Sequence, residues 1–460
     1  MNRIGSLFNL PWFRRIWVIQ EVTLNPKVYA RCCNITVPWF IVEVCARLVA
    51  FQMLQLRSIK YVLNVNPNPN PTLPAFSVFW AFGPKRHPKI CDLLLDTDAF
   101  EATVPRDMLY AIYHLAADLP NLGFFPDYEQ SLQATYATFT MQVIKATGSL
   151  RILSFAGRLS APKTWTWVPE YHQICLQSTW HATRSSASDS ASLRYQARLY
   201  KSIYTLVEEA IILGGVHFAD VSYILQPQTP FSFPALWQSL LSQHERICLG
   251  RRDKRMDDHS EAIGLSMTDF FDVLTFEGTA EFSGALRSMY AAFWIDQDPD
   301  LHSLVTSPVN RSILRRLAKN VQSEFLKAQA ALHLSERTWS GQCLFLTQDG
   351  SLGFCPPWAK VDDLVVILDG GHRPFLLRPI DTLASSESRT VAAKRGQEFQ
   401  LVGNCYLQGA MPDEVFKSPR WSDVDPLYED PMDYDPGFTS PGGGKGYSKG
   451  FYRKRPFVIV

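Results

Sequence analysis

Glu21 is the first residue of this sequence whose type and setting suggest acid–base chemistry. It follows a short segment rich in aromatic residues, in which Arg14 and Arg15 lie between two tryptophans. A carboxylate in a partly apolar setting can act as a general base or stabilise a positive charge. A glutamate that follows an arginine-containing turn is more commonly half of an ion pair. We therefore keep Glu21 as a catalytic candidate beside that structural interpretation.

A second set of residues has the types needed for nucleophilic catalysis. Cys343, Asp363 and His372 could serve as nucleophile, orienting carboxylate and base. However, Cys343 lies in a strand-like segment and His372 follows two glycines, which favours a core thiol and a loop. His244 and Glu245 lack the second histidine that a helical zinc site needs, and phosphate-binding glycine motifs are absent. The sequence predicts no cofactor and no metal.

The elements around Glu21 are predicted to be helical. Wound at about 100° per residue, the segment from Pro11 to Glu21 forms one apolar arc that includes Gln20. An unpartnered amide in such an arc costs about 1–3 kcal/mol, so Gln20 should bond to backbone or to a polar neighbour. The two tryptophans demand a substantial partner surface.

Six residues of this segment match the pattern Trp-Phe-x-Arg-x-Trp-x-x-Gln-Glu: Trp12, Phe13, Arg15, Trp17, Gln20 and Glu21. This pattern resembles the closing motif of the fungal heterokaryon-incompatibility (HET) domain. The two earlier parts of that domain, a Ser-Tyr-x-Trp-Gly strand and a Trp-Ile-Asp…Cys-Ile-Asn-Gln segment, do not occur here. The resemblance implies an N-terminally truncated protein, with residues 1–63 as an incomplete HET remnant.

Three later phrases are similar to the region that follows the HET domain in such fungal proteins. They begin at Pro105, where Val104 replaces the usual aspartate, at Phe125 and at Trp165. The residues that carry the likeness are Arg106, Asp107, Tyr110, Asp127, Tyr128, Tyr136, Trp167 and Pro169. Taken physically, Asp107 can cap a helix and Arg106 can donate to a carboxylate such as Asp127. Scaffold roles are favoured over substrate binding.

The whole chain is predicted to be an α+β protein. An Asn/Pro-rich linker or loop at 64–89 follows the remnant, and a mainly helical body spans 90–335, with helical patterning at 195–212 and from 231. An antiparallel β module at 336–416 is expected to be a small barrel or a curled sheet. The tail at 417–460 is expected to be disordered.

The β module is predicted from alternating apolar segments separated by turn residues. One hairpin joins 343–347 to 352–355 through Gln348-Asp349-Gly350, and a second joins 364–368 to 374–378 through Asp369-Gly370-Gly371. A fifth strand is expected at 400–409.

Composition narrows the functional classes. A net charge of +1 over 460 residues excludes a surface covered by phosphate-binding Lys and Arg, so no nucleic-acid partner is expected. Nine cysteines without Cys-x-x-Cys pairs indicate reduced thiols. The longest apolar stretch, at 37–63, contains four charged residues, so we expect no membrane span. No signal peptide is evident, which favours the cytoplasm.

The resemblance implies a non-enzymatic signalling or interaction protein of fungal non-self recognition and programmed cell death. A protein partner or self-assembly is expected, and the missing N-terminal part should impair signalling. A small-molecule ligand stays open. One alternative is an NAD-cleaving glycohydrolase similar to Toll/interleukin-receptor domains, to which this chain supplies Glu21. Another is a gene relic without function.

Overall fold

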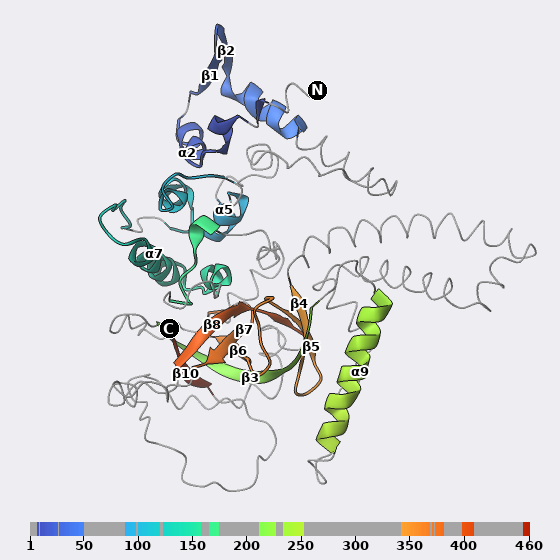
Figure 1. Cartoon of the computed structure of the whole chain (residues 1–460). Helices are drawn as coiled ribbons and strands as arrows, with labels where there is room; N and C mark the ends of the chain where they lie inside the picture. Colours follow the sequence, from blue (N-terminus) through green and yellow to red (C-terminus); the bar gives the residue numbers. More distant parts are fainter. Residues whose placement is uncertain are drawn as a thin grey trace, which may run out of the picture.

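The computed structural model is arranged in three successive parts (Figure 1). A small N-terminal unit lies at one end, a group of helices lies in the middle, and a β-sheet lies at the other end with a long helix beside it. The structure describes residues 7–8, 10–25, 27–49, 88–97, 100–119, 123–157, 165–173, 211–226, 233–252, 342–368, 370–371, 373–380, 398–408 and 454–460.

The N-terminal unit does not contain the single helix predicted around the aromatic arc. A 3-10 turn, η1 (Pro11–Arg14), is followed by α2 (Trp17–Thr23), and the chain is extended at Arg15 between them. The break has a clear cause, because this backbone pairs with Glu101. The amide of Glu101 donates to the carbonyl of Arg14 at 2.7 Å, and the amide of Ile16 donates to the carbonyl of Glu101 at 3.0 Å.

A hairpin and a helix complete this unit. β1 (Tyr29–Cys32) pairs antiparallel with β2 (Ile35–Pro38). Residues 39–49 are helical. This helix starts where Pro38 ends the hairpin. Its continuation towards 63 and the Asn/Pro-rich segment at 64–71 lie outside the described residues.

The middle part contains short helices within the region predicted to be mainly helical. They are α5 (Ile90–Asp96), α6 (Asp107–Tyr110), η2 (Tyr113–Leu115), α7 (Leu132–Thr147), η3 (Arg151–Phe155) and η4 (Tyr171–Gln173). The longest, α7, begins where the Ser131 hydroxyl accepts the amide of Ala134, and it ends at Gly148 in the left-handed conformation. Tyr136, Phe139 and Val143 belong to its buried face.

The sheet contains eight strands in the order β10-β8-β7-β6-β3-β4-β5-β9. Both predicted hairpins are confirmed, as β4 (Cys343–Thr347) with β5 (Leu352–Cys355) and as β6 (Leu364–Leu368) with β7 (Phe375–Pro379). The predicted fifth strand is divided into β8 (Glu398–Asn404) and β9 (Tyr406–Leu407), which pair with different neighbours. The sheet curls, since β10 pairs with both β8 and β3, but the eight strands do not close into a barrel.

Two strands contradict the sequence prediction. β3 (Ile211–Leu225) starts inside a segment expected to be helical, and β10 (Lys454–Ile459) lies in a tail expected to be disordered. β3 is the longest strand and pairs with β10, β6 and β4 along its length. The middle of the sequence therefore contributes to the sheet, and the described residues do not clearly show the mainly helical body predicted at 90–335. The helical prediction after 231 holds in α9 (Phe233–Arg252), while 253–341 lies outside the described residues.

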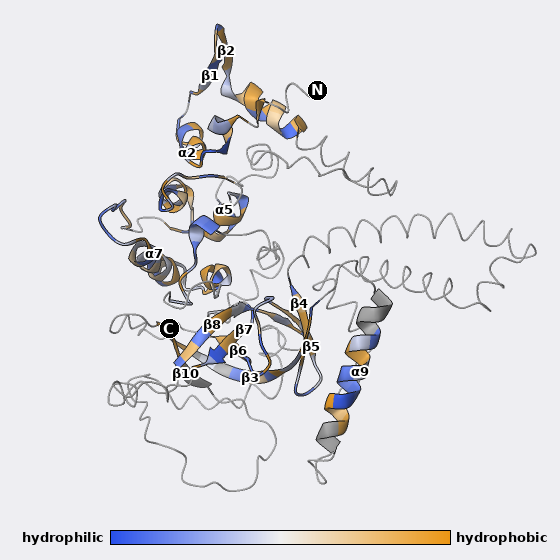
Figure 2. Ribbon diagram, in the orientation of Figure 1, coloured by the Kyte–Doolittle hydropathy of each residue, from blue (hydrophilic) through white to orange (hydrophobic). Residues whose placement is uncertain are grey.

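The core is continuous from the N-terminal unit through the helices to one face of the sheet. Ile19, Leu109, Ile144, Phe399 and Phe457 belong to the same cluster of buried side chains. A second cluster packs on the other face and contains Cys343, Cys355 and Cys405. Figure 2 shows hydrophobic residues concentrated in the strands, whereas α9 mixes hydrophilic and hydrophobic residues. In the described part of the chain, no helix is both long and apolar enough to cross a bilayer.

Candidate functional site

The Asp107 carboxylate joins the N-terminal unit to the helical part. The indole Nε1 of Trp17, at the start of α2, donates to Asp107 Oδ2 at 2.9 Å across 90 residues of sequence. Asp107 was predicted to cap its own helix, and this is wrong, because the cap position of α6 is Arg106 and has no side-chain cap bond. The carboxylate instead turns to a distant donor. A hydrogen bond to a charged acceptor contributes about 1.5–3 kcal/mol.

Tyr128 gives the same carboxylate a second donor. Its hydroxyl donates to Asp107 Oδ1 at 2.8 Å, so each oxygen accepts one bond from a different segment. Desolvation, followed by the hydrogen bond to Asp107, raises the pKa of Tyr128 to about 12. The hydroxyl therefore stays protonated and remains a donor at neutral pH. We call Trp17, Arg106, Asp107, Tyr110, Asp127 and Tyr128 the Asp107 junction.

Arg106 and Asp127 do not form the ion pair suggested by the sequence. Arg106 donates to the carbonyl of Tyr128 at 3.3 Å and to the carbonyl of Gln130. The Asp127 carboxylate instead accepts the amides of Glu129 at 2.8 Å and Gln130 at 3.3 Å. Arg106 thus fixes the loop at 127–130 through its carbonyl groups, and the Asp127 side chain closes a turn within this loop.

Tyr110 holds the same loop from α6. Its hydroxyl donates to the carbonyl of Asp127 at 2.9 Å and accepts the amide of Asp127 at 3.0 Å. The Tyr110 ring is buried and packs edge-on against Tyr128, with centroids 5.5 Å apart. These contacts keep Tyr128 in place beside Asp107.

A second set of bonds continues from the junction through α7. Tyr136 donates to the carbonyl of Pro105 at 2.9 Å and lies 3.2 Å from Nδ1 of His172. Thr140 and Tyr171 share a buried hydrogen bond of 2.7 Å. Burial raises the pKa of Tyr136 and Tyr171 and lowers the pKa of His172, so the neutral forms are favoured.

The segment around Trp167 connects these helices to the sheet. The amide of Thr166 donates to the carbonyl of Val460 at 3.1 Å, and the Thr166 hydroxyl accepts the amide of Leu401 at 2.8 Å. Trp167 and Pro169 are buried. All four phrases singled out in the sequence are therefore linked in one series of contacts that runs from α2 to β8.

The remaining residues of the N-terminal motif lie in different environments. Phe13 is buried, Arg15 and Glu21 are exposed, and Gln20 is half-buried, so its amide is not fully withdrawn from water. Arg14 pairs with Glu101 at 3.6 Å, and both side chains are exposed.

The two indoles of the motif differ in exposure. Trp12 is 38% exposed and packs edge-on against Phe13 and Trp39, whereas Trp17 is half-buried. The aromatic face is therefore partly covered by the chain's own residues, and Trp12 stays at the surface.

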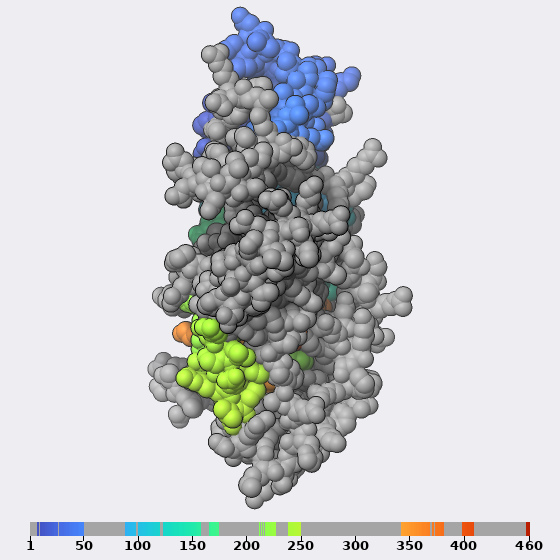
Figure 3. Space-filling view, turned by 90° about the vertical axis from the view of Figure 1, so that its right-hand side faces the viewer, coloured from blue at the N-terminus to red at the C-terminus, as the bar shows by residue number. Residues whose placement is uncertain are grey.

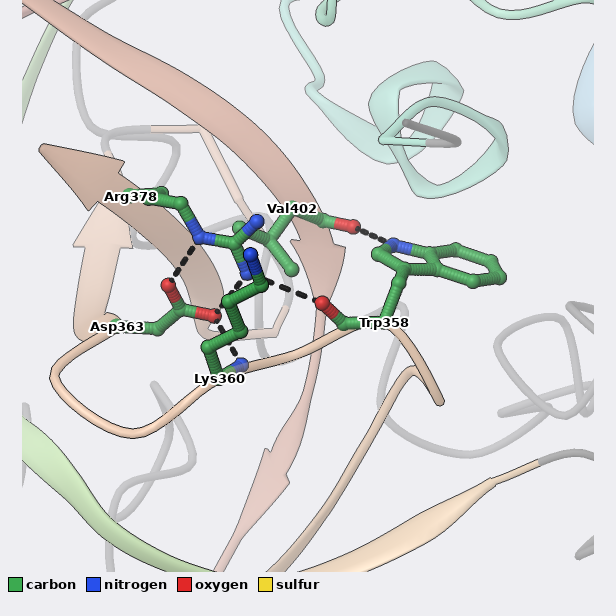
Figure 4. A network of polar contacts seen from close by, with 5 residues as sticks. All are labelled: Trp358, Lys360, Asp363, Arg378 and Val402. Carbon is green, nitrogen blue, oxygen red and sulfur yellow. Dashed lines mark hydrogen bonds and ion pairs between the residues drawn. The ribbon is translucent and has the colours of Figure 1, made fainter. Parts of the chain in front are cut away.

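A different carboxylate, Asp363, is held within the sheet (Figure 4). Arg378 donates its Nε to Oδ1 at 2.8 Å and its Nη2 to Oδ2 at 2.9 Å, and the amide of Lys360 donates to Oδ2 at 2.7 Å. Arg378 also reaches the carbonyl of Trp358 at 3.0 Å, while the Trp358 indole donates to the carbonyl of Val402 at 2.6 Å. The Asp363 side chain is only 1% exposed.

This geometry argues against the nucleophilic set considered from the sequence. Asp363 is engaged by a guanidinium and a backbone amide, so its role is to fix the turn before β6. Cys343 is a buried core thiol, and desolvation raises its pKa to about 11, which disfavours the thiolate that nucleophilic attack needs. His372 lies outside the described residues. Within the described ranges, no three His, Cys, Asp or Glu side chains gather as ligands for a cation.

Sequence reasoning identified the residues of the Asp107 junction but not their partners. Trp17 and Asp107 are 90 positions apart, and neither residue type specifies which acceptor an indole will find. The sequence analysis did not identify Arg378 as a partner of Asp363. A signal was available, because an arginine near the end of an apolar strand needs an acidic partner if it is buried, and Asp363 lies 15 residues earlier. Comparisons with protein-family models, with curated proteins and with solved structures returned no match.

Proposed function

We propose that this chain is a non-enzymatic signalling or interaction protein of the heterokaryon-incompatibility class, acting in fungal non-self recognition and cell death. The observation that carries the proposal is the hydrogen bond between Trp17 and Asp107. It links the HET-like motif to the first of the three phrases that resemble the following region. Tyr128, of the second phrase, donates to the same carboxylate.

The surface of the N-terminal unit supports a protein partner. Ten large apolar side chains in this unit are exposed: Leu7, Leu10, Trp12, Leu24, Tyr29, Ile35, Phe40, Ile41, Val44 and Leu48. These side chains are available for contact with another protein, since large exposed apolar surfaces mark protein-binding sites. Figure 3 shows the unit at one end of the molecule.

The residues suited to chemistry support the non-enzymatic interpretation. Asp107 and Asp363 both accept hydrogen bonds from fixed donors of the chain itself, as expected of scaffold carboxylates. Glu21 is exposed on α2, so its carboxylate is not enclosed in a buried site.

The proposal is tested by inducible expression in fungal hyphae. The readout is the fraction of dead compartments, scored with a vital dye, in single strains and in fusions between incompatible strains. We expect the wild-type chain to change the death response and Trp17→Phe, which removes only the indole donor, to weaken that change. Trp12→Phe is the matched control because it leaves the bond to Asp107 intact.

Two results would contradict the proposal. One is a wild-type chain that is expressed at verified levels but leaves death unchanged, both alone and in incompatible fusions. The other is release of nicotinamide from NAD by the purified protein that is lost in Glu21→Gln, since this would make the chain a glycohydrolase.

A further inference from the structure

Two adjacent cysteines occupy the tip of the β1–β2 hairpin, which points away from the other described elements (Figure 1). Cys32 and Cys33 are both exposed, and neither is in a disulfide. Consecutive α-carbons lie about 3.8 Å apart, so two neighbouring thiols are within reach of one shared ligand atom. The hairpin therefore presents a pair of accessible thiols to solvent.

The residue type at this tip is not the one that turn stability alone would favour. Cys32 pairs with Ile35, which leaves Cys33 and Asn34 as a two-residue loop. Cys33 has a φ of 52°, in the left-handed region, which costs an ordinary L-residue roughly 1–2 kcal/mol. Glycine or asparagine is the usual choice at such positions, and Asn34 stands immediately after it.

The left-handed residue also changes how the two side chains are arranged. In a regular strand, successive side chains point to opposite faces. The backbone of Cys33 departs from that alternation. The Nε of Arg31 donates to the carbonyl of Cys33 at 3.4 Å and helps to fix the loop.

The other described cysteines are poor competitors for an external ligand. Cys91, Cys343, Cys355 and Cys405 are buried, and Cys45 and Cys248 are half-buried. Burial raises the pKa of Cys91 to about 12 and that of Cys343 to about 11, so both remain protonated near neutral pH. Among the described residues, the exposed thiols are those of Cys32 and Cys33.

We propose that Cys32 and Cys33 form a bidentate site for trivalent arsenic compounds. With an organic arsenoxide, two sulfur–arsenic bonds form and the arsenic–oxygen bond breaks. The two thiol protons leave with that oxygen as water, and arsenic stays trivalent, so no oxidant is required. The site is separate from the Asp107 junction and does not depend on the function proposed above.

The test uses the full-length protein and phenylarsine oxide. After incubation, an excess of 2-mercaptoethanol removes arsenic held by one thiol, and intact-mass spectrometry measures what is retained. We expect one phenylarsenic adduct that survives the monothiol and is removed by the dithiol 2,3-dimercaptopropanol. Cys32→Ser and Cys33→Ser should each reduce retention about 100-fold, because the second bond is lost.

Three controls make the result specific. Asn34→Ser changes the same loop without removing a thiol, and Cys343→Ala disrupts the cross-strand pair with Cys355; both should retain the adduct. Peptide mapping should place the arsenic on the peptide that contains Cys32 and Cys33. Circular dichroism checks that the exposed serine variants fold. Full retention in either serine variant, or a wild-type adduct that the monothiol removes, would overturn the proposal.

Discussion

Replacing Arg378 by methionine should strongly destabilise the sheet without touching the Asp107 junction. The change removes both guanidinium bonds to Asp363, which is 1% exposed, and leaves the carboxylate with the amide of Lys360. Breaking a buried ion pair by removing one partner costs about 3–5 kcal/mol, because an uncompensated charge stays in the core. Two charge-assisted bonds at about 1.5–3 kcal/mol each give about 3–6 kcal/mol, which overlaps that range.

The variants around this pair separate charge from geometry. Arg378→Lys keeps the positive charge but cannot form the forked contact, so it should lose less than Arg378→Met. In the double variant Asp363→Asn, Arg378→Met, no charge is left unpaired. Its loss should therefore be smaller than the sum of the two single losses.

The assay is hydrogen exchange followed by mass spectrometry on the intact chain, with urea unfolding monitored in parallel. Faster exchange should appear in β6, which follows Asp363, and in β7, which contains Arg378. Exchange in α7 should be much less affected. If Arg378→Met lost under about 1 kcal/mol, the value of a surface ion pair, the assignment of Asp363 as a buried structural carboxylate would be refuted.

Three further predictions concern contacts elsewhere in the chain. Trp17→Phe should cost about 1.5–3 kcal/mol and speed hydrogen exchange in α2 and α6, with Trp12→Phe as the control. Equal exchange in both variants would contradict the bond to Asp107. Desolvation lowers the pKa of His172 in the folded chain, so the unfolded chain binds more protons and stability should fall as the pH drops through 6.5 and below. In His172→Asn, the midpoint of urea unfolding should depend less on pH. A pH dependence equal to that of the wild type would contradict this prediction. Gly353→Ala should lower the free energy of unfolding in urea by about 3 kcal/mol, since the Cβ of the alanine would lie 2.3 Å from the carbonyl oxygen of Tyr406. A variant as stable as the wild type would show that the two strands do not approach so closely.

The hairpins of the sheet could be predicted because their signals are local. An apolar run, a turn containing Asp349 and Gly350, and a second apolar run specify a strand pair without reference to the rest of the chain. The cap of α7 is equally local, with Ser131 at one end and Gly148 at the other. Such elements depend on residues that are neighbours in the sequence.

β3 and β10 could not be predicted in the same way. β3 contains Gly214 and Gly215, which disfavour a regular strand in isolation. In the structure, a Cβ on Gly215 would lie 2.8 Å from the carbonyl oxygen of Ile367, so glycine permits the close approach of β6. The need for glycine at this position therefore depends on β6, which lies about 150 residues later in the sequence. β10 lies in a polar, glycine-rich tail, and its pairing partners are equally remote.

The candidate site shows the same division between residue types and partners. The N-terminal motif and the later phrases singled out Trp17, Asp107 and Tyr128. In the structure, Trp17 and Tyr128 both donate to the Asp107 carboxylate. The roles assigned from local chemistry were wrong, because Asp107 accepts from a distant indole instead of capping its helix. A short polar side chain at a helix start has a local partner available, but a charged carboxylate gains more from two side-chain donors.

The hydrogen bonds of Asp363 and those of Asp107 differ in strength, and this difference suggests which of them a signalling partner would affect. Asp363 is buried and its loss would cost about 3–5 kcal/mol, so the sheet is firmly fixed. One link between the N-terminal unit and the helices is the hydrogen bond from the half-buried Trp17 to Asp107, at about 1.5–3 kcal/mol, and it adds to the backbone bonds with Glu101 and to the shared core. A partner that bound the exposed apolar surface of this unit about 100-fold more tightly in a released state would supply about 2.7 kcal/mol, which is comparable with that bond. Under the proposed function, the Trp17–Asp107 bond is therefore one contact on which a partner would act, and the core of the sheet would be left intact.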